Sequence, residues 1–290
     1  MIKLINMFSP SKVLTCCLVF SVNLVHAQLL WKITGSQLQG TSYLFGTTGS
    51  LCKDEFFVPA KVTAAFRESA ILCTEIDMSK PEDPKKLEPL LMIPQGDPSL
   101  HDGMDSIKFD ELLRYFADSL SLDLIKLQWA KPLLAATIVI TRGIPCKQAV
   151  SIEKEMIATA IREKKSIVAL ENITDQVKIY DSIPDMVEGE ILLSRIRNIN
   201  KGNETYFRSA HAYRRQDLNE LEALYEASEA ERPYRSLFLA DRHIAWIPKM
   251  KAQLTKGTVF FAVAAAHLAG DKGLIQLLRN EGFTVEPLPD

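Results

Sequence analysis

The sequence predicts an α/β fold, with a central mixed or parallel sheet flanked by helices and a large helical portion in the middle of the chain. Two largely apolar runs, residues 70–76 and 258–268, are typical of strands that are buried on both faces. The pattern between residues 80 and 256 is mostly helical. The chain has 290 residues, of which 47% are hydrophobic and 24% are charged, so it can bury one large core or two modest ones.

The first 27 residues have the layout of a secretory signal peptide. Lys3 and Lys12 precede an apolar run over residues 13–25, and the small residue Ala27 marks the predicted cleavage site. The run is too short and, with Asn23 inside it, too polar for a transmembrane helix. We therefore expect export, either to the periplasm or out of the cell.

The mature chain is predicted to be one domain, residues 28–290, with no membrane span. A lipid anchor at Cys16 or Cys17 is an alternative to cleavage after the signal. Cleavage removes two lysines and no acidic residue, so the formal net charge changes from −2 to −4. Basic clusters and aromatic platforms are lacking in the sequence, and we expect no nucleic-acid partner. The oligomeric state is left open.

The mature chain begins with a predicted β-hairpin that leads into a glycine-rich loop. The hairpin comprises residues 29–33 and 41–45, and the loop GTTGS, residues 46–50, follows at once. Glycines at a strand end allow the backbone to approach a ligand closely. The other predicted elements are helices over residues 59–69, 109–120, 122–129, 151–165 and 274–278, and strands over residues 166–170 and 283–285.

Local sequence patterns define one of these segments clearly and leave another ambiguous. Ser151 followed by acidic residues is a helix start signal, so the helix over residues 151–165 is well defined at its beginning. Residues 133–140 are apolar throughout, and their periodicity does not decide between a helix and a strand.

Three cysteines remain after removal of the signal peptide. Cys52 and Cys146 both lie in loop-like segments, and export permits a disulfide, so we predict a bridge between them. Cys73 lies inside an apolar strand and is expected to be a buried, small hydrophobic residue. The spacing of the cysteines does not indicate a zinc knuckle.

Candidate functional side chains stand near the ends of the two most apolar strands. His267 lies at the end of the run 258–268, and Glu75 lies near the end of the run 70–76. Strand ends are where α/β proteins place functional groups, and a carboxylate in a buried strand requires a partner or a metal. The alternatives are a structural histidine that forms hydrogen bonds near a strand end, and a carboxylate that faces outward.

A helical segment late in the chain adds a second group of polar residues. Arg242 and Trp246 are four residues apart, so they are neighbours on one helix face, while His243 is rotated by about 100° from Arg242. Glu171 is another carboxylate at the end of a predicted strand.

The chain resembles the TraB/GumN family, a group that also includes the Tiki proteins, over essentially the whole mature sequence. Each matching piece is short, and their order along the chain makes the resemblance specific. The pieces are Leu30-Trp31-Lys32-Ile33, Ser42-Tyr43-Leu44-Phe45-Gly46-Thr47, Cys73-Thr74-Glu75-Ile76-Asp77, Val168-Ala169-Leu170-Glu171-Asn172 with Gln176, Asp241-Arg242-His243 with Trp246, and Ala264-Ala265-Ala266-His267-Leu268 with the glycines that follow.

The resemblance implies a metal-dependent hydrolase that acts on peptides or proteins. In the family, two Gly-x-x-His motifs and a glutamate are thought to hold a divalent metal such as manganese, cobalt or zinc, which would activate water. Glu75 and His267 match two of these ligands, and Arg242 would steady a carboxylate or an oxyanion. The early motif ends in Gly49, where the family has histidine, and the late motif begins with Ala264 instead of glycine.

Several interpretations of Gly49 stay open. His243 stands where the family usually has asparagine, and it could replace the missing metal ligand, or it could be a neutral exchange on a polar surface. Alternatively, the chain is a catalytically inactive family member that binds a peptide or small ligand in the same cleft. A deliberate alteration of residue 49 is a third explanation. A Ser-His-Asp hydrolase is excluded because Ser50 lacks the flanking glycines of a Gly-x-Ser-x-Gly turn.

Overall fold

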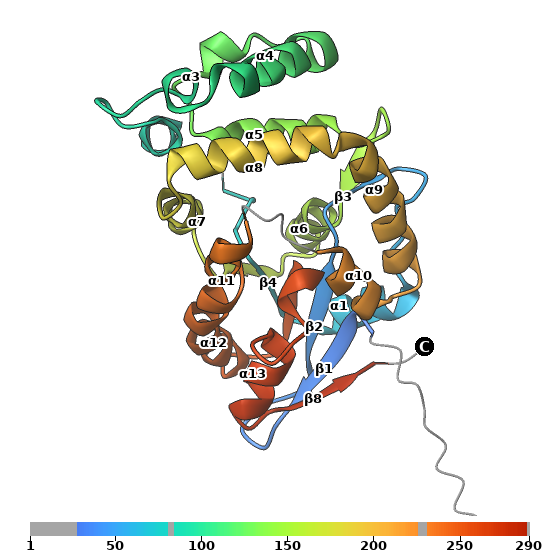
Figure 1. Cartoon of the computed structure of the whole chain (residues 1–290). Coiled ribbons are helices and arrows are strands. Elements are labelled where there is room, and N and C mark those ends of the chain that lie inside the picture. Colours follow the sequence, from blue (N-terminus) through green and yellow to red (C-terminus); the bar gives the residue numbers. More distant parts are fainter. Residues whose placement is uncertain (1–27, 81–83, 226–230, 289–290) are drawn as a thin grey trace, which may run out of the picture.

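A mixed six-stranded sheet forms the centre of the computed structural model, which describes residues 28–80, 84–225 and 231–288 (Figure 1). The strand order is β6-β4-β7-β2-β1-β8. Strands β6, β4, β7 and β2 run parallel to one another, whereas β1 is antiparallel to both β2 and β8. The α/β prediction is therefore confirmed. The strands are β1 (Leu30–Thr34), β2 (Ser42–Thr47), β4 (Ile71–Thr74), β6 (Ser166–Ala169), β7 (Val259–Ala264) and β8 (Thr284–Pro287).

The central strand β7 is shorter than the apolar run that predicts it. It ends at Ala264, and a single 3₁₀ turn, η4 (Ala265–His267), follows. The reason is pairing: the ladder with β2 stops at Ala264 and the ladder with β4 stops at Ala262, so the chain has no strand partner beyond this point. The prediction of a strand that runs into His267 is wrong by three residues.

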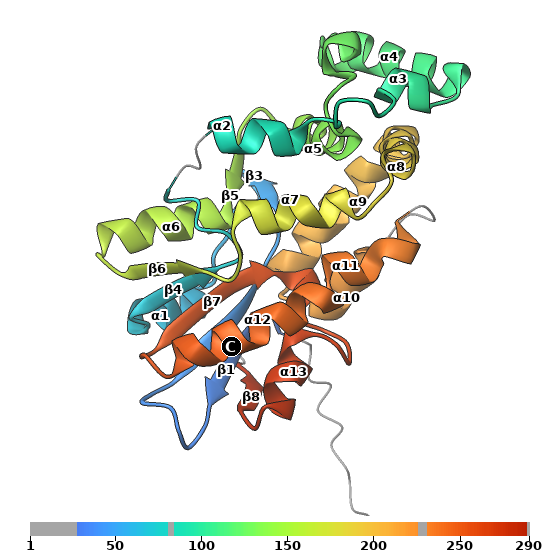
Figure 2. The ribbon, with the colours of Figure 1, turned by 90° about the vertical axis from the view of Figure 1, so that its left-hand side faces the viewer.

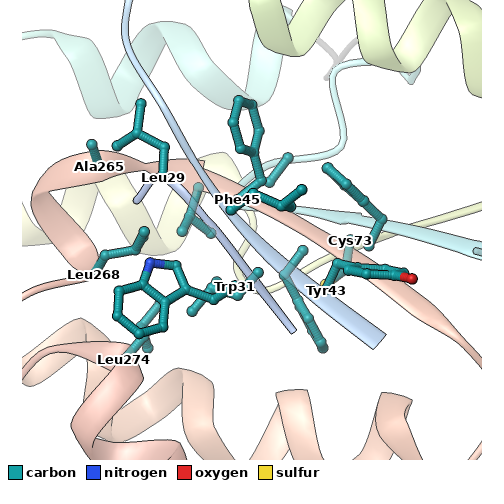
Figure 3. Close-up of a cluster of buried hydrophobic side chains, with 14 of the residues drawn as sticks. Leu29, Trp31, Tyr43, Phe45, Cys73, Ala265, Leu268 and Leu274 are labelled. Atoms are coloured by element: carbon teal, nitrogen blue, oxygen red, sulfur yellow. The ribbon is translucent and has the colours of Figure 1, made fainter. Parts of the chain in front are cut away.

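Helices cover the sheet and bury its apolar side chains in one large cluster (Figures 2 and 3). Trp31, Tyr43 and Phe45 from β1 and β2 belong to the same buried cluster as Leu268 and Leu274, and all five are labelled in Figure 3. The helices that contribute to this cluster are α1 (Ala60–Glu68), α6 (Ile152–Arg162), α9 (Ile199–Arg214), α10 (Leu218–Leu224), α12 (Ala240–Leu254) and α13 (Leu274–Asn280). Side chains of α7 (Ile173–Asp181), the 3₁₀ helix η3 (Arg232–Tyr234) and α11 (Arg235–Phe238) pack against a second cluster, described next.

The helical portion in the middle of the chain has its own hydrophobic cluster, above the sheet in Figure 1. Its elements are α2 (Pro84–Leu87), η1 (Glu88–Leu91), α3 (Leu100–Gly103), α4 (Ser106–Leu120), η2 (Leu124–Leu127), α5 (Pro132–Arg142) and α8 (Asp185–Arg197). The ambiguous residues 133–140 belong to helix α5. Leu133, Ala135, Ala136 and Val139 are all buried, and burial around much of the helix removes the amphipathic period.

A second, two-stranded sheet joins the glycine-rich loop to the start of α6. Strand β3 (Ser50–Cys52) pairs with β5 (Ala149–Ser151), so the loop-like assignment of residue 52 is corrected to a strand. The predicted disulfide is confirmed, since Cys52 and Cys146 are bonded with their Cα atoms 5.8 Å apart. Cys73 is a buried free thiol, as predicted.

The predicted signal peptide, its cleavage after Ala27 and the alternative lipid anchors at Cys16 and Cys17 all lie outside the described residues. Within the described ranges, no helix combines the length and the apolar character that a membrane crossing requires.

Candidate functional site

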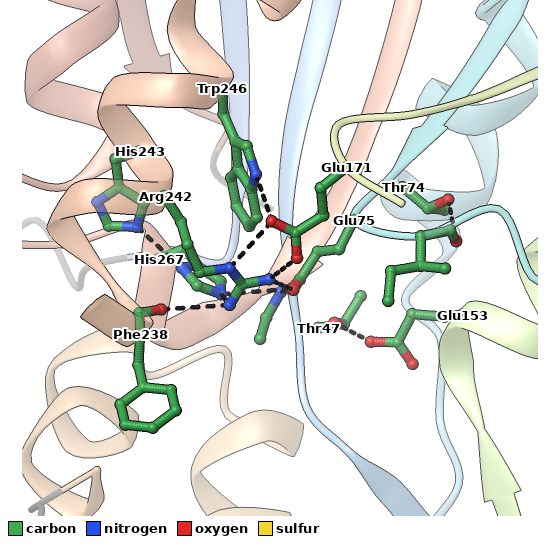
Figure 4. Close-up of polar contacts among 12 residues, drawn as sticks. Thr47, Thr74, Glu75, Glu153, Glu171, Phe238, Arg242, His243, Trp246 and His267 are labelled. Carbon is green, nitrogen blue, oxygen red and sulfur yellow. Dashed lines mark hydrogen bonds and ion pairs between the residues drawn. The ribbon is translucent and has the colours of Figure 1, made fainter. Parts of the chain in front are cut away.

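The candidate site lies at the carboxyl ends of the parallel strands (Figure 4). Glu75 directly follows β4, His267 ends the turn after β7, and Glu171 follows β6 by two residues. Helix α12 packs beside them and contributes Arg242, His243 and Trp246. Parallel neighbours deliver their ends to one edge of the sheet, which is why residues from distant segments meet here. The side chain of Arg242 lies at the centre of this group.

Arg242 donates hydrogen bonds to four residues of the site. Its Nη2 lies 2.6 Å from Glu75 Oε2 and 2.5 Å from Glu171 Oε1, and its Nε lies 3.3 Å from Glu171 Oε2. Its Nη1 lies 3.2 Å from both the Phe238 carbonyl oxygen and His267 Nε2. Burial disfavours the charged guanidinium, but the two carboxylates outweigh this and raise the pKa of Arg242 further. The guanidinium is therefore a fixed cation.

Glu75 is held as a carboxylate. Its Oε1 accepts from the Ala264 backbone N–H at 2.8 Å and lies 3.4 Å from His267 Nε2. Burial tends to raise the pKa of Glu75, whereas the neighbouring His267, the charge of Arg242 and the Ala264 N–H together lower it to about 2. Glu75 is ionised throughout the neutral range.

Two histidines lie side by side behind Glu75. His243 Nε2 is 2.8 Å from His267 Nδ1, and His243 Nδ1 is 2.6 Å from the carbonyl oxygen of Lys272. Both rings are buried, with exposures of 2% and 3%. Burial, aided by the charge of Arg242, lowers the pKa of His243 to about 4. Both ring nitrogens of His243 are thus engaged in hydrogen bonds.

Trp246 completes the wall of the site. Its Nε1 donates to Glu171 Oε2 at 3.0 Å, and its ring lies 4.5 Å from the Arg242 guanidinium carbon. The Trp246 ring is also 4.7 Å from the His267 ring. The predicted neighbourhood of Arg242 and Trp246 on one helix face agrees with this contact.

Sequence reasoning missed the part of the site that Glu153 occupies. Glu153, in the first turn of α6, accepts hydrogen bonds from Thr47 Oγ1 and from Ser151 Oγ. Burial raises the pKa of Glu153, and the charge of Glu75 adds to the shift. An acidic residue after a Ser N-cap is common at the start of a helix, so the sequence suggested only a capping role for Glu153. The structure shows in addition that this first turn of α6 contacts Thr47.

The described side chains around Glu75 and His267 do not by themselves form a complete set of metal ligands. The 3.4 Å between Glu75 Oε1 and His267 Nε2 falls within the roughly 3 to 5 Å expected for two ligands of one ion with bonds near 2.1 Å. However, the guanidinium of Arg242 already contacts both residues, and Gly49 offers no side chain. Among the described residues, no three His, Cys, Asp or Glu side chains are arranged so that they could hold a metal ion. His243 is oriented toward His267 and Lys272.

Comparison with known proteins gives one match. The sequence profile of the TraB/PrgY/gumN family matches residues 29–287, which is nearly the whole of the described chain. No curated protein and no solved structure matches the chain significantly. Because the profile spans far more than half of the sequence and includes both strands that deliver Glu75 and His267, the chain belongs to the TraB/PrgY/gumN family.

Proposed function

We propose that this family member binds a peptide or small ligand at the carboxyl edge of its sheet and lacks metal-dependent hydrolysis. One observation supports this most: all five N–H groups of Arg242 are used inside the site, on Glu75, Glu171, His267 and the Phe238 carbonyl. Glu75 Oε2 and His267 Nε2, two atoms that could bind a metal ion, thereby already contact an internal cation.

The charges at this edge indicate what kind of ligand it favours. Two carboxylates, Glu75 and Glu171, face one guanidinium, and His243 is neutral near pH 7. The uncompensated negative charge favours a ligand that brings a positive charge or hydrogen-bond donors, such as the amino group of a peptide. The proposal also includes export, which the Cys52–Cys146 disulfide supports because disulfides persist in oxidising compartments.

Metal binding is the direct test. The mature chain, residues 28–290, is treated with a chelator, dialysed against manganese, cobalt or zinc, and assayed for metal stoichiometry, thermal shift and peptide hydrolysis. We expect sub-stoichiometric metal, no thermal shift and no hydrolysis. One equivalent of metal together with peptide hydrolysis that is lost in E75Q and H267Q would refute the proposal.

A matched pair of variants isolates the effect of the missing histidine. A side chain at Gly49 would enter open space, since a Cβ there meets no atom within 4 Å, and the same is true of Gly257, which precedes β7 at the other end of the strand. We expect metal uptake to appear in Gly49→His and to stay absent in Gly257→His. Uptake in neither variant would show that the family's ligand assignment does not apply to Glu75 and His267.

A metal-dependent hydrolase is the second candidate function, and the spacing of Glu75 and His267 favours it. In that case, Glu75 and His267 would be metal ligands, Arg242 would stabilise a carboxylate or an oxyanion, and His243 would be an additional ligand. The hydrogen bonds of His243 favour a different role for that residue.

A further inference from the structure

We propose that His243 is a positioning residue: it fixes the proton of His267 on Nδ1, so that the Nε2 lone pair of His267 faces the guanidinium of Arg242. The inference rests on the proposed function only in taking this edge of the sheet as the binding site. It replaces a ligand role for His243 with one that acts through His267.

The direction of the first hydrogen bond follows from chemistry alone. The Lys272 carbonyl oxygen can only accept, so His243 Nδ1, at 2.6 Å, must carry a proton and donate it. His243 is only 2% exposed, so burial favours the neutral imidazole, and a neutral imidazole with a proton on Nδ1 has a lone pair on Nε2. His243 Nε2 is therefore an acceptor.

The second hydrogen bond transmits this arrangement to His267. His243 Nε2 lies 2.8 Å from His267 Nδ1, and since Nε2 accepts, His267 Nδ1 must donate. The remaining ring nitrogen, His267 Nε2, lies 3.2 Å from Arg242 Nη1, which can only donate. Every donor from the Lys272 carbonyl to Arg242 is thus matched to an acceptor when both histidines have their protons on Nδ1.

One helix holds the His267 ring on three sides. Arg242, His243 and Trp246 all belong to α12; the first two contact opposite ring nitrogens, and the Trp246 ring lies 4.7 Å from the ring centre. The two imidazoles meet edge to face at 79° with their centres 5.0 Å apart. A ring flip of His267 would break both of its hydrogen bonds. This kind of partner is what orients a functional histidine and sets its tautomer.

The tautomer of His267 can be measured directly. In the full mature chain labelled with ¹⁵N-histidine and freed of metal by a chelator, long-range ¹H–¹⁵N correlation spectra distinguish protonated from unprotonated ring nitrogens. His267→Gln identifies the signals of that ring. At pH 7.5 we expect His267 to be protonated on Nδ1 and unprotonated on Nε2, and a proton on Nε2 would overturn the inference.

Two variants separate positioning from packing. The amide oxygen of glutamine in His243→Gln can take the place of Nε2 and accept from His267, whereas the shorter asparagine in His243→Asn can reach only the Lys272 side. We expect the Nδ1 tautomer of His267 to persist in His243→Gln and to become a mixture in His243→Asn. His101→Gln, at a histidine with 54% side-chain exposure, is the control and should leave the His267 signals unchanged.

An unchanged His267 tautomer in a folded His243→Asn protein would also overturn the inference. If that variant does not fold, the tautomer in the unaltered chain decides alone. The spectra are recorded without metal, so their outcome is independent of whether the metal experiments support the proposed function.

Discussion

Glu188, on helix α8, is a buried carboxyl group whose ionisation should make the stability of the protein fall as the pH rises. Its exposure is 0%, its Oε2 accepts from the Leu133 backbone N–H at 3.3 Å, and its Oε1 has no partner among the described residues. Burial raises the pKa of Glu188 from 4.5 to about 8, with the charge of Asp185 adding to the shift. The folded protein therefore keeps this proton over a range in which the unfolded chain releases it.

The sign and size of the effect follow from linkage. Below pH 4.5, Glu188 is protonated in both the folded and the unfolded state, so it adds no pH dependence to the free energy of unfolding. Between pH 4.5 and about 8, the folded state binds more protons than the unfolded state, so the free energy of unfolding falls as the pH rises. At about 1.4 kcal/mol per pH unit, the loss reaches about 3 kcal/mol at pH 7. Glu188→Gln keeps an acceptor for Leu133 and cannot ionise, so it removes this pH dependence.

Urea unfolding of the unaltered protein and Glu188→Gln, followed by tryptophan fluorescence between pH 4.5 and 7.5, measures the difference. We expect the variant to gain about 3 kcal/mol relative to the unaltered protein over this range. Glu190→Gln, on the same helix with 44% side-chain exposure, is the control and should show little change with pH. Equal pH dependence of the unaltered protein and Glu188→Gln would refute the reasoning.

Two further stability predictions come from the site and its surroundings. Trp246→Phe removes the hydrogen bond to the charged Glu171 Oε2 and should lower the free energy of unfolding by about 2 to 3 kcal/mol. The control variant Trp129→Phe, at a residue with 46% exposure, should change the free energy of unfolding by less than about 0.5 kcal/mol. Equal losses in the two variants would contradict this account. Replacing Cys52 and Cys146 together by serine opens a loop with a sequence separation of 94, and by the chain-entropy model should cost about 4 to 5 kcal/mol in denaturant unfolding. A loss below about 1 kcal/mol would show that the unfolded chain is already compact there.

The fold is predictable from sequence where burial leaves a pattern. Strands β4 and β7 are buried nearly throughout, so their apolar runs predict them. Strands β3 and β5 have three residues each and exist because they pair with each other across about 100 residues, and no local pattern reports such pairing. The end of β7 is likewise set by the ends of its neighbours, which is why sequence extended it too far.

Sequence patterns predicted only some of the residues of the candidate site. Glu75 and His267 stand out because polar groups at the ends of apolar strands are unusual. Glu171 also follows a predicted strand, but it was not among the predicted site residues. The parallel pairing of β4 with β6 places the Glu171 backbone nitrogen 3.0 Å from the Glu75 carbonyl oxygen. Strand order, which sequence does not supply, was needed to place the two carboxylates side by side. Glu153 gave only a capping signal, and its contact with Thr47 is purely tertiary.

Retention of Glu75 and His267 is not by itself retention of a metal function. The same lone pairs that suit a divalent ion also suit a guanidinium, and Arg242 satisfies them with donors that leave none of its own unpaired. A metal would have to displace an internal cation whose charge is already matched by Glu171. Because Gly49 has no side chain, an ion held by Glu75 and His267 alone would form few bonds to offset that displacement. Whether a metal binds therefore depends on more than the presence of these two residues.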